Sequence, residues 1–269
     1  MLCSEEPLRV LHLSDLHLGK DPQWSYQGVR PWERLADALV GVDPECLGAQ
    51  DLTQAPFDLV MVTGDLSHDQ GSEVYARLSE QLESLKVPVL VLPGNHDQPD
   101  DFQRFFAGRE QVGYCSEYEA GGWRLLCLNS QVPGQIAGRI GEQQLTWLER
   151  ALNEQEKRDQ PTLLALHHAP IEIGTPWLDA QRLEDGDSFI ELVEQYDQVR
   201  GVIFGHVHQD FDSRRESGLR LLAAPAVSIQ FLPGSPAFAV EPSPPGVRWL
   251  ELGADGNMRS EVWWLEGCE

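Results

Sequence analysis

Side chains that can bind a metal ion follow five separate apolar runs of this sequence. The runs are short and rich in Val, Leu and Ile, as in "VMVTGD" and "VLVLPGNHD", and each ends abruptly in carboxylate, amide or imidazole groups. One Gly-Asn turn would account for a single ending of this kind, because both residues tolerate turn conformations. Five such endings indicate a common functional site. The residues concerned are Asp15, His17, Asp65, Asn95, His96, Asp97, His167, His168, His206 and His208.

The arrangement of these residues along the chain predicts that they lie together. Apolar runs of this length are typical of strands, and helical patterns lie between several of them, which predicts a layered α/β architecture. In open α/β sheets, ligands bind at the carboxyl ends of the strands. Asp15 and His17 are two residues apart, so both point the same way from the end of their strand, and His206 and His208 repeat that spacing.

Nitrogen and oxygen donors are more numerous here than one metal ion requires. Two carboxylates, one amide oxygen and four imidazoles make seven donors, whereas a tetrahedral zinc ion takes four. If one carboxylate is shared, seven donors supply four ligands to each of two ions. Two ions about 3.5–4 Å apart clamp the attacking and leaving oxygens of a phosphoryl displacement. Such a mixed donor set admits iron, manganese or zinc.

The composition narrows the class of protein. The chain has 43 acidic against 20 basic residues and a formal net charge of −23, which argues against nucleic acid as a partner. An anionic substrate would need a strong local positive charge, and a bound metal supplies one. The N-terminus carries no membrane-length apolar segment, and the five cysteines are scattered, which predicts a cytoplasmic protein with reduced thiols and no membrane association. The 269 residues predict a single domain, 1–269.

Local patterns predict three helices and a terminal hairpin. Residues 72–85 and 141–152 place leucines on one helical face, and residues 188–196 form a shorter helix with Ser188 as its N-cap. Residues 247–266 predict an antiparallel hairpin with its turn at 254–257, whose free edge could pair with a second copy in a homodimer. The Pro- and Gly-rich segment 232–246 predicts a loop.

The motifs, taken in order, resemble those of a known family. "SDLHLG", "TGDLSHD", "PGNHD", "LHHAP" and "GHVHQ" are similar to the five motifs of the calcineurin-like metallophosphoesterases. That resemblance implies a four-layer α/β/β/α sandwich of two facing sheets. "LNSQVPG", "TPWLD" and "GVRWLELGADG" further resemble the class III cyclic nucleotide phosphodiesterases, which hydrolyse 3′,5′-cyclic AMP. The similarity covers nearly the whole chain.

The resemblance also implies roles for individual residues. A metal-bridging hydroxide would be the nucleophile, and His96 would donate a hydrogen bond to the phosphate or protonate the leaving oxygen. Asn95 and His208 would also contact substrate, and Asp97 would orient the groups around it. One metal would be held by Asp15, His17, Asp65 and His208, and the other by Asp65, Asn95, His167 and His206, so that Asp65 bridges. The sequence departs from many relatives at His68, where they carry an acid, and Asp69 is a candidate to support His96 in its place.

Several neighbouring residues admit two interpretations. His167 is favoured over His168 as the ligand, and His168 then packs or faces the rim of the site. His12 lies within the first strand and is expected to be structural. His68 either lines the cleft or is exposed on a loop. In the loop after the first motif, Trp24, Tyr26 and Arg30 either contact the base and phosphate of a nucleotide or pack onto the body of the protein.

The function favoured by these observations is metal-dependent hydrolysis of 3′,5′-cyclic AMP to 5′-AMP. The alternative keeps the chemistry but changes the substrate to a glycerophosphodiester, a 2′,3′-cyclic nucleotide or another phosphate ester. A regulatory protein that binds without turnover would be expected to have lost ligands or His96, and none is lost.

Overall fold

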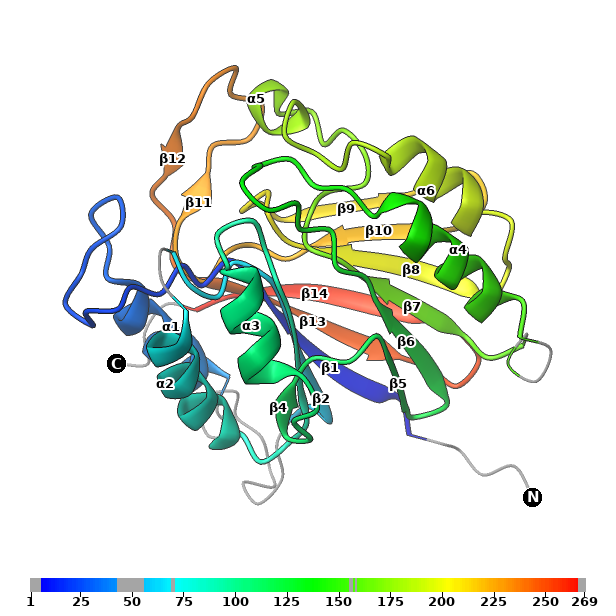
Figure 1. Cartoon of the computed structure of the whole chain (residues 1–269), viewed down its shortest axis with the longest axis horizontal. Helices are drawn as coiled ribbons and strands as arrows, with labels where there is room; N and C mark the ends of the chain where they lie inside the picture. Colours follow the sequence, from blue (N-terminus) through cyan, green and yellow to red (C-terminus); the bar gives the residue numbers. More distant parts are fainter. Residues whose placement is uncertain (1–5, 43–55, 69–70, 155–156, 158, 266–269) are drawn as a thin grey trace.

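Two six-stranded sheets face one another in the computed structural model, which describes residues 6–42, 56–68, 71–154, 157 and 159–265 (Figure 1). Sheet one has the order β14-β13-β1-β2-β3-β4, and sheet two has the order β5-β6-β7-β8-β10-β9. The strands of sheet one are β1 (Leu8–Leu13), β2 (Leu59–Thr63), β3 (Val89–Leu92), β4 (Val112–Gly113), β13 (Gly246–Leu252) and β14 (Met258–Trp264). Those of sheet two are β5 (Glu117–Ala120), β6 (Trp123–Cys127), β7 (Thr162–Ala165), β8 (Val199–Phe204), β9 (Phe211–Arg214) and β10 (Arg220–Ala223).

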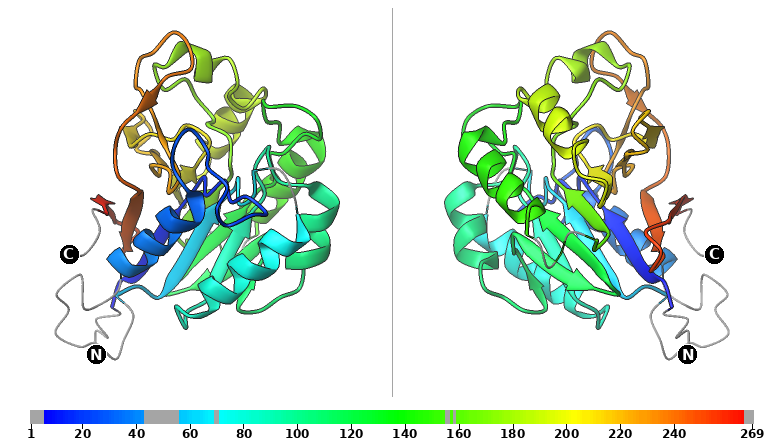
Figure 2. Two further views of the ribbon diagram at one scale, coloured as in Figure 1. Left: turned by 90° about the vertical axis from the view of Figure 1, so that its left-hand side faces the viewer. Right: turned by 90° about the vertical axis from the view of Figure 1, so that its right-hand side faces the viewer.

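Helices cover the outer face of each sheet (Figure 2). Apolar side chains of α1 (Pro31–Gly41), α2 (Ser72–Glu83) and α3 (Pro99–Phe106) pack on sheet one. Those of α4 (Gly141–Leu152) and α6 (Gly186–Val193) pack on sheet two, together with the single-turn α5 (Pro176–Asp179). The expected α/β/β/α sandwich with a C-terminal hairpin is therefore confirmed.

Alternation along the strands explains the layers. In β1, Leu8 and Val10 face the core between the two sheets, whereas Leu11 and Leu13 face the helices. His12 points into the same inter-sheet layer as Val10, and its Nε2 lies 2.8 Å from Thr63 Oγ1 on β2. The expectation that His12 is a structural histidine is confirmed by this buried hydrogen bond.

Most predicted elements appear close to their expected bounds, but the N-cap at Ser188 is wrong. Helix α6 begins at Gly186, with Asp185 at the N-cap position. The Asp185 carboxylate does not cap its own helix. It accepts hydrogen bonds from the backbone N–H groups of Ile140 and Gly141, at 3.0 and 2.8 Å, where α4 begins. Within the predicted loop 232–246, Val240–Glu241 forms the short strand β12, which pairs with β11 (Gln230–Phe231).

Three further features bear on membrane-spanning helices, on the cysteines and on the edge of sheet one. Across the described ranges, no helix combines the length and apolarity that a membrane crossing requires. Cys115 and Cys127 are free thiols, and Cys3, Cys46 and Cys268 lie outside the described residues. Strand β14 is an edge of sheet one, and pairing of this edge with a second copy stays a prediction.

Candidate metal centre

The ten polar residues singled out in the sequence all follow parallel strands of the two sheets. Strands β1, β2 and β3 are parallel neighbours in sheet one, and β7 and β8 are parallel neighbours in sheet two. Their carboxyl ends meet where the sheets face each other. There the His167 Nδ1 atom lies 2.7 Å from the carbonyl oxygen of Thr63 at the end of β2, and the His206 N–H donates to Asp15 Oδ2 at 3.0 Å. The centre therefore spans both sheets.

The backbone is strained at this junction. Seven non-glycine residues of the described chain have positive φ, and five of them are expected ligands. Left-handed backbone is costly for side chains of this size, and such strain concentrates at functional sites, where surrounding structure enforces it. The five residues are Asp15, His17, Asp65, His206 and His208, with φ between 47° and 69°.

The first expected ligand set converges around Asp15 and two histidines. His17 Nε2 lies 3.1 Å from His208 Nε2, and His208 Nε2 lies 3.3 Å from Asp15 Oδ1. Asp65 Oδ2 completes the set at 3.5 Å from His17 Nε2. All four side chains are almost wholly buried.

The second set converges on the opposite side of Asp65. His167 Nε2 lies 3.5 Å from Asp65 Oδ2 and 3.2 Å from Asn95 Oδ1. His206 Nδ1 lies 3.1 Å from the same Asn95 oxygen. A single oxygen, Asp65 Oδ2, therefore lies 3.5 Å from a histidine of each set, which is the position that a bridging carboxylate requires.

Backbone carbonyl contacts fix the tautomer of two of these histidines. Backbone carbonyl oxygens only accept, so His167 Nδ1, 2.7 Å from Thr63 O, and His208 Nδ1, 2.7 Å from Ile229 O, both carry protons. In the neutral rings, each Nε2 then presents a lone pair to the centre. Carbonyl contacts of this kind orient histidine ligands in metal sites.

The spacing of the donors matches the coordination shell of a cation. With metal–ligand distances of about 2.0–2.2 Å, neighbouring ligand atoms of a tetrahedral or octahedral ion lie roughly 3.0–3.5 Å apart. The contacts within the two sets fall between 3.1 and 3.5 Å. The side chains present therefore suit two cations that share Asp65.

The pKa values of the buried carboxylates and of His167 also fit a cation-binding centre. Burial acts to raise the pKa of Asp15, but the neighbouring His208 brings it down to about 2. Burial likewise opposes the ionisation of Asp65, but His167, His96 and His17 together lower its pKa well below the usual range. Burial acts to lower the pKa of His167, but the neighbouring Asp65 raises it, and the resulting pKa is about 9. A metal ion that binds here must displace a proton from His167, and it then neutralises two buried carboxylates.

His96 lies at the centre without belonging to either set. Its backbone N–H donates to Asp65 Oδ1 at 2.9 Å, and its Nδ1 lies 3.2 Å from the carbonyl oxygen of His68. Because that oxygen only accepts, Nδ1 carries a proton and Nε2 is left for other contacts. The half-buried ring lines a cavity of about 210 Å³ beside Asn95, His206 and His208.

Asp97 lies behind the centre. Its Oδ1 accepts from the Ser67 N–H at 3.1 Å and the Tyr75 hydroxyl at 2.9 Å, while its Oδ2 accepts from the N–H groups of Leu66 and Gly94 at 3.1 and 2.9 Å. Burial first, and Asp65 second, raise the pKa of this carboxyl to about 6. Asp97 therefore joins the loop after β2 to the loop after β3, and its carboxyl is fully engaged in doing so.

Close approach explains the glycine in "PGNHD". A Cβ on Gly94 would lie 2.1 Å from Asp65 Oδ1 and 2.3 Å from the Asp65 backbone nitrogen. Real Cβ atoms do not approach this closely, so a side chain here would displace the carboxylate that the two ligand sets share.

The two histidines with open interpretations both pack beside the centre. His168 is buried, its Nδ1 lies 2.8 Å from Ser130 Oγ, and its Nε2 lies 2.9 Å from the Ile136 carbonyl oxygen, so both ring nitrogens are engaged. His68 is half-buried: its Nδ1 lies 3.1 Å from His17 Nδ1, and its ring stacks on His96 with 4.8 Å between centroids. His68 therefore supports the centre from the side, and Asp69 lies outside the described residues.

Besides the expected ligand His17, the segment after β1 contributes Tyr26 to the cavity. Burial raises the pKa of Tyr26 to about 12. Trp24 stacks on Tyr26 with 5.9 Å between ring centroids, which fits the packing interpretation. Arg30 is at the surface, where it pairs with Glu33 at 2.7 Å, and is not among the residues that line the cavity.

An apolar wall of the cavity was missed by the sequence analysis. It consists of Ile136, Trp177, Leu178, Phe231 and Phe238. The sequence contains two signals for it, the tryptophan of "TPWLD" and the phenylalanine in the Pro- and Gly-rich segment 232–246, but neither shows periodicity that would assign it to a face.

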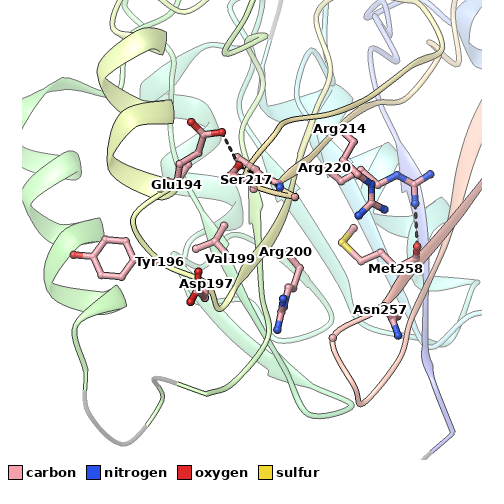
Figure 3. Close-up of a pocket in the computed structure, with 14 residues that line it drawn as sticks. Glu194, Tyr196, Asp197, Val199, Arg200, Arg214, Ser217, Arg220, Asn257 and Met258 are labelled. Atoms are coloured by element: carbon pink, nitrogen blue, oxygen red, sulfur yellow. Dashed lines mark hydrogen bonds between the residues drawn. The ribbon is translucent and has the colours of Figure 1, made fainter.

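A larger cavity, of about 420 Å³, lies away from this chemistry (Figure 3). It is bordered by the end of α6, the start of β8, the β9–β10 connection and the turn before β14. Three arginines line it, and Arg220 is already paired with Asp212 at 2.6 Å. None of the expected ligands lines this cavity, so the smaller cavity at the strand ends is the candidate functional site.

Comparison with known proteins bears on which chemistry this centre performs. The sequence model of the calcineurin-like phosphoesterases matches residues 8–210, which include every expected ligand. The chain belongs to this family. Phosphoesterases hydrolyse phosphate esters, and the relatives described next are phosphodiesterases by name, so the chain is a hydrolytic enzyme.

Curated relatives of this calcineurin-like phosphoesterase align over nearly its whole length. It is 35% identical to the 3′,5′-cyclic adenosine monophosphate phosphodiesterase CpdA of Escherichia coli, over 97% of this chain and 91% of the relative. It is 38% identical to a probable cyclic nucleotide phosphodiesterase of Synechococcus, over 96% of this chain and 93% of the relative. A solved dimetal phosphatase from Danio rerio superposes with a TM-score of 0.59 at 16% identity, covering 97% of this chain and 100% of that one, which supports the fold.

Asp97→Asn is predicted to weaken the junction between the two loops. The amide replaces one oxygen with an NH₂ group that faces N–H or O–H donors, which costs about 1–3 kcal/mol in the free energy of unfolding. Urea unfolding at pH 7 measures the loss. Tyr75→Phe is the matched control, because it removes only one of the four hydrogen bonds to Asp97. A loss in Asp97→Asn no greater than that in Tyr75→Phe would contradict the assigned role.

Proposed function

We propose that this phosphoesterase hydrolyses 3′,5′-cyclic AMP to 5′-AMP at a centre of two metal ions. The observation that carries the proposal is the pair of ligand sets that meet at Asp65 Oδ2, 3.5 Å from His17 on one side and from His167 on the other. Its relatives over nearly the full chain are named as 3′,5′-cyclic AMP or cyclic nucleotide phosphodiesterases, which supports the choice of substrate.

The two ions are assigned to the sets described above. When bound, they supply Lewis-acid activation of a water nucleophile and of the phosphoryl group. Carboxylate, amide and imidazole groups bind iron, manganese or zinc in other proteins, so this combination of ligands is compatible with all three metals. The residues that would hold the ions are Asp15, His17, Asp65, Asn95, His167, His206 and His208.

Side chains of the chain itself hold the phosphate and assist the leaving group. Asn95, His96 and His208 line the same cavity, so a phosphoryl group that enters it meets an amide and two imidazoles. His96 is the proposed acid: its Nδ1 is held by the His68 carbonyl, and its Nε2 carries a proton to the 3′ oxygen as the P–O bond breaks. Asp97 acts as a positioning residue, since its carboxyl holds the loops that carry Asp65 and Asn95.

Substrate preference tests this proposal. We expect kcat/KM of the metal-reconstituted protein to be highest for 3′,5′-cyclic AMP, when compared with 2′,3′-cyclic AMP, a glycerophosphodiester and 5′-AMP. Equal or higher values for the other esters would contradict the assignment to cyclic AMP and favour a broader metallophosphodiesterase. Metal-free protein, prepared with a chelator, is the control and should be inactive on all four.

His96→Ala tests the proposed acid. We expect the variant to keep the metal content of the wild type while turnover of 3′,5′-cyclic AMP falls by about 10² or more, because an acid–base group is lost. The loss should be much smaller for bis(p-nitrophenyl) phosphate, whose leaving group departs without a proton. Equal losses on both substrates would remove His96 from leaving-group protonation.

A further inference from the structure

The cavity at the metal centre has two chemically different parts. Its polar part consists of the proposed ligands and His96, and its apolar part comes from elements outside all five motifs. Trp177 and Leu178 lie on α5, and Phe231 lies on β11. In Figures 1 and 2, α5 and the β11–β12 pair lie side by side and extend beyond the sheets.

Three aromatic rings pack edge to face in this apolar part, with 65–73° between their planes. The Phe231 ring lies 5.0 Å from that of Trp177 and 5.4 Å from that of Phe238, and the Trp177 and Phe238 rings are 5.6 Å apart, all measured between centroids. Phe231 also stacks on the proposed ligand His208, with 3.9 Å between centroids and 12° between planes. The aromatic surface therefore begins at the metal centre itself.

The outer end of this surface is exposed. Phe238 is 47% exposed and Ile136 is 56% exposed, and both line the cavity. Large apolar side chains left exposed beside polar groups mark ligand-binding grooves. The buried Phe231 anchors the surface, while Phe238 offers an uncovered ring.

A polar group lies next to the aromatic surface. Gln181, two residues beyond α5, lines the same cavity, and its side-chain amide makes no hydrogen bond to other residues of the described chain. An amide of this kind offers one donor and one acceptor edge, which pairs with the amino group and ring nitrogen of adenine.

We propose that Trp177, Phe231 and Phe238 form an aromatic wall for the purine base of the nucleotide, which stacks on the exposed Phe238 ring, with Gln181 at the edge of the base. The proposal deepens the function proposed above and rests on it for the position of the phosphate. Stacking on aromatic rings contributes to nucleotide binding without positive charge. Such binding suits a chain of net charge −23, because away from the metal centre its charge repels an anionic nucleotide.

Phe238→Ala tests the stacking proposal, because a half-exposed ring can be removed without opening the core. The probes are 5′-AMP and ribose 5-phosphate, which share the phosphate and ribose and differ by the base. Isothermal titration of the metal-loaded protein gives both values of Kd. In the wild type we expect tighter binding of 5′-AMP, and in Phe238→Ala a loss of about tenfold for 5′-AMP alone. Phe238→Tyr keeps a ring and should restore the wild-type preference.

The controls separate this proposal from the function itself. Leu232→Ala removes an exposed side chain of the same β11–β12 loop that is not among the residues lining the cavity, and should change neither Kd. Gln181→Ala should weaken the binding of 5′-AMP and leave the Kd of ribose 5-phosphate unchanged. Equal weakening of both ligands in Phe238→Ala, or no weakening of either, would overturn the stacking proposal. In that case, turnover of 3′,5′-cyclic AMP by the wild type would still support the proposed function. Conversely, a wild type that prefers 5′-AMP over ribose 5-phosphate but does not turn over 3′,5′-cyclic AMP would refute the proposed function and leave the stacking proposal intact.

Discussion

The arrangement of this protein depends on two carboxylates buried where the sheets meet. Asp15 and Asp65 are almost fully shielded from water, and both keep a pKa low enough to be anionic at neutral pH. Buried charges persist only when they are paired or bound to metals. Asp65 also accepts from the His96 N–H through its side chain and from the His17 N–H through its backbone carbonyl, at 2.9 and 2.8 Å. Both ligand sets and the proposed acid are therefore placed relative to one residue.

The four-layer sandwich makes this junction stable. Helices cover the outer faces and an apolar layer fills the space between the sheets, so the strands are held firmly at their carboxyl ends. Rigid elements of this kind can enforce positive φ at five ligand positions, because the strain is offset by the surrounding packing. Elements at the ends of the sheets, such as α5 and the β11–β12 pair, surround the centre, and Leu178 and Phe231 join them to the core of sheet two.

The sequence predicted some parts of this structure better than others. Strand ends with ligand chemistry could be predicted because they combine a continuous apolar run with residue types that seldom follow a strand together. The helices at 72–85 and 141–152 could be predicted from a clear apolar face. The N-cap was wrongly placed at Ser188 because α6 begins earlier, after Asp185, whose carboxylate binds the backbone of Ile140 and Gly141, 45 and 44 residues earlier in the chain. Phe231 and Phe238 were missed because they reach the cavity through tertiary contacts that leave no local pattern. The place of Asp97 behind the centre is equally a matter of long-range hydrogen bonds.

The most direct test of the two-ion centre is a crystal structure of the metal-loaded protein with anomalous scattering measured at the metal edge. We expect two peaks about 3.5–4 Å apart, with the Asp65 carboxylate between them and Asn95 beside only one. A single peak, or a second peak among His17, His68 and His96, which also lie close enough together to hold an ion, would contradict it.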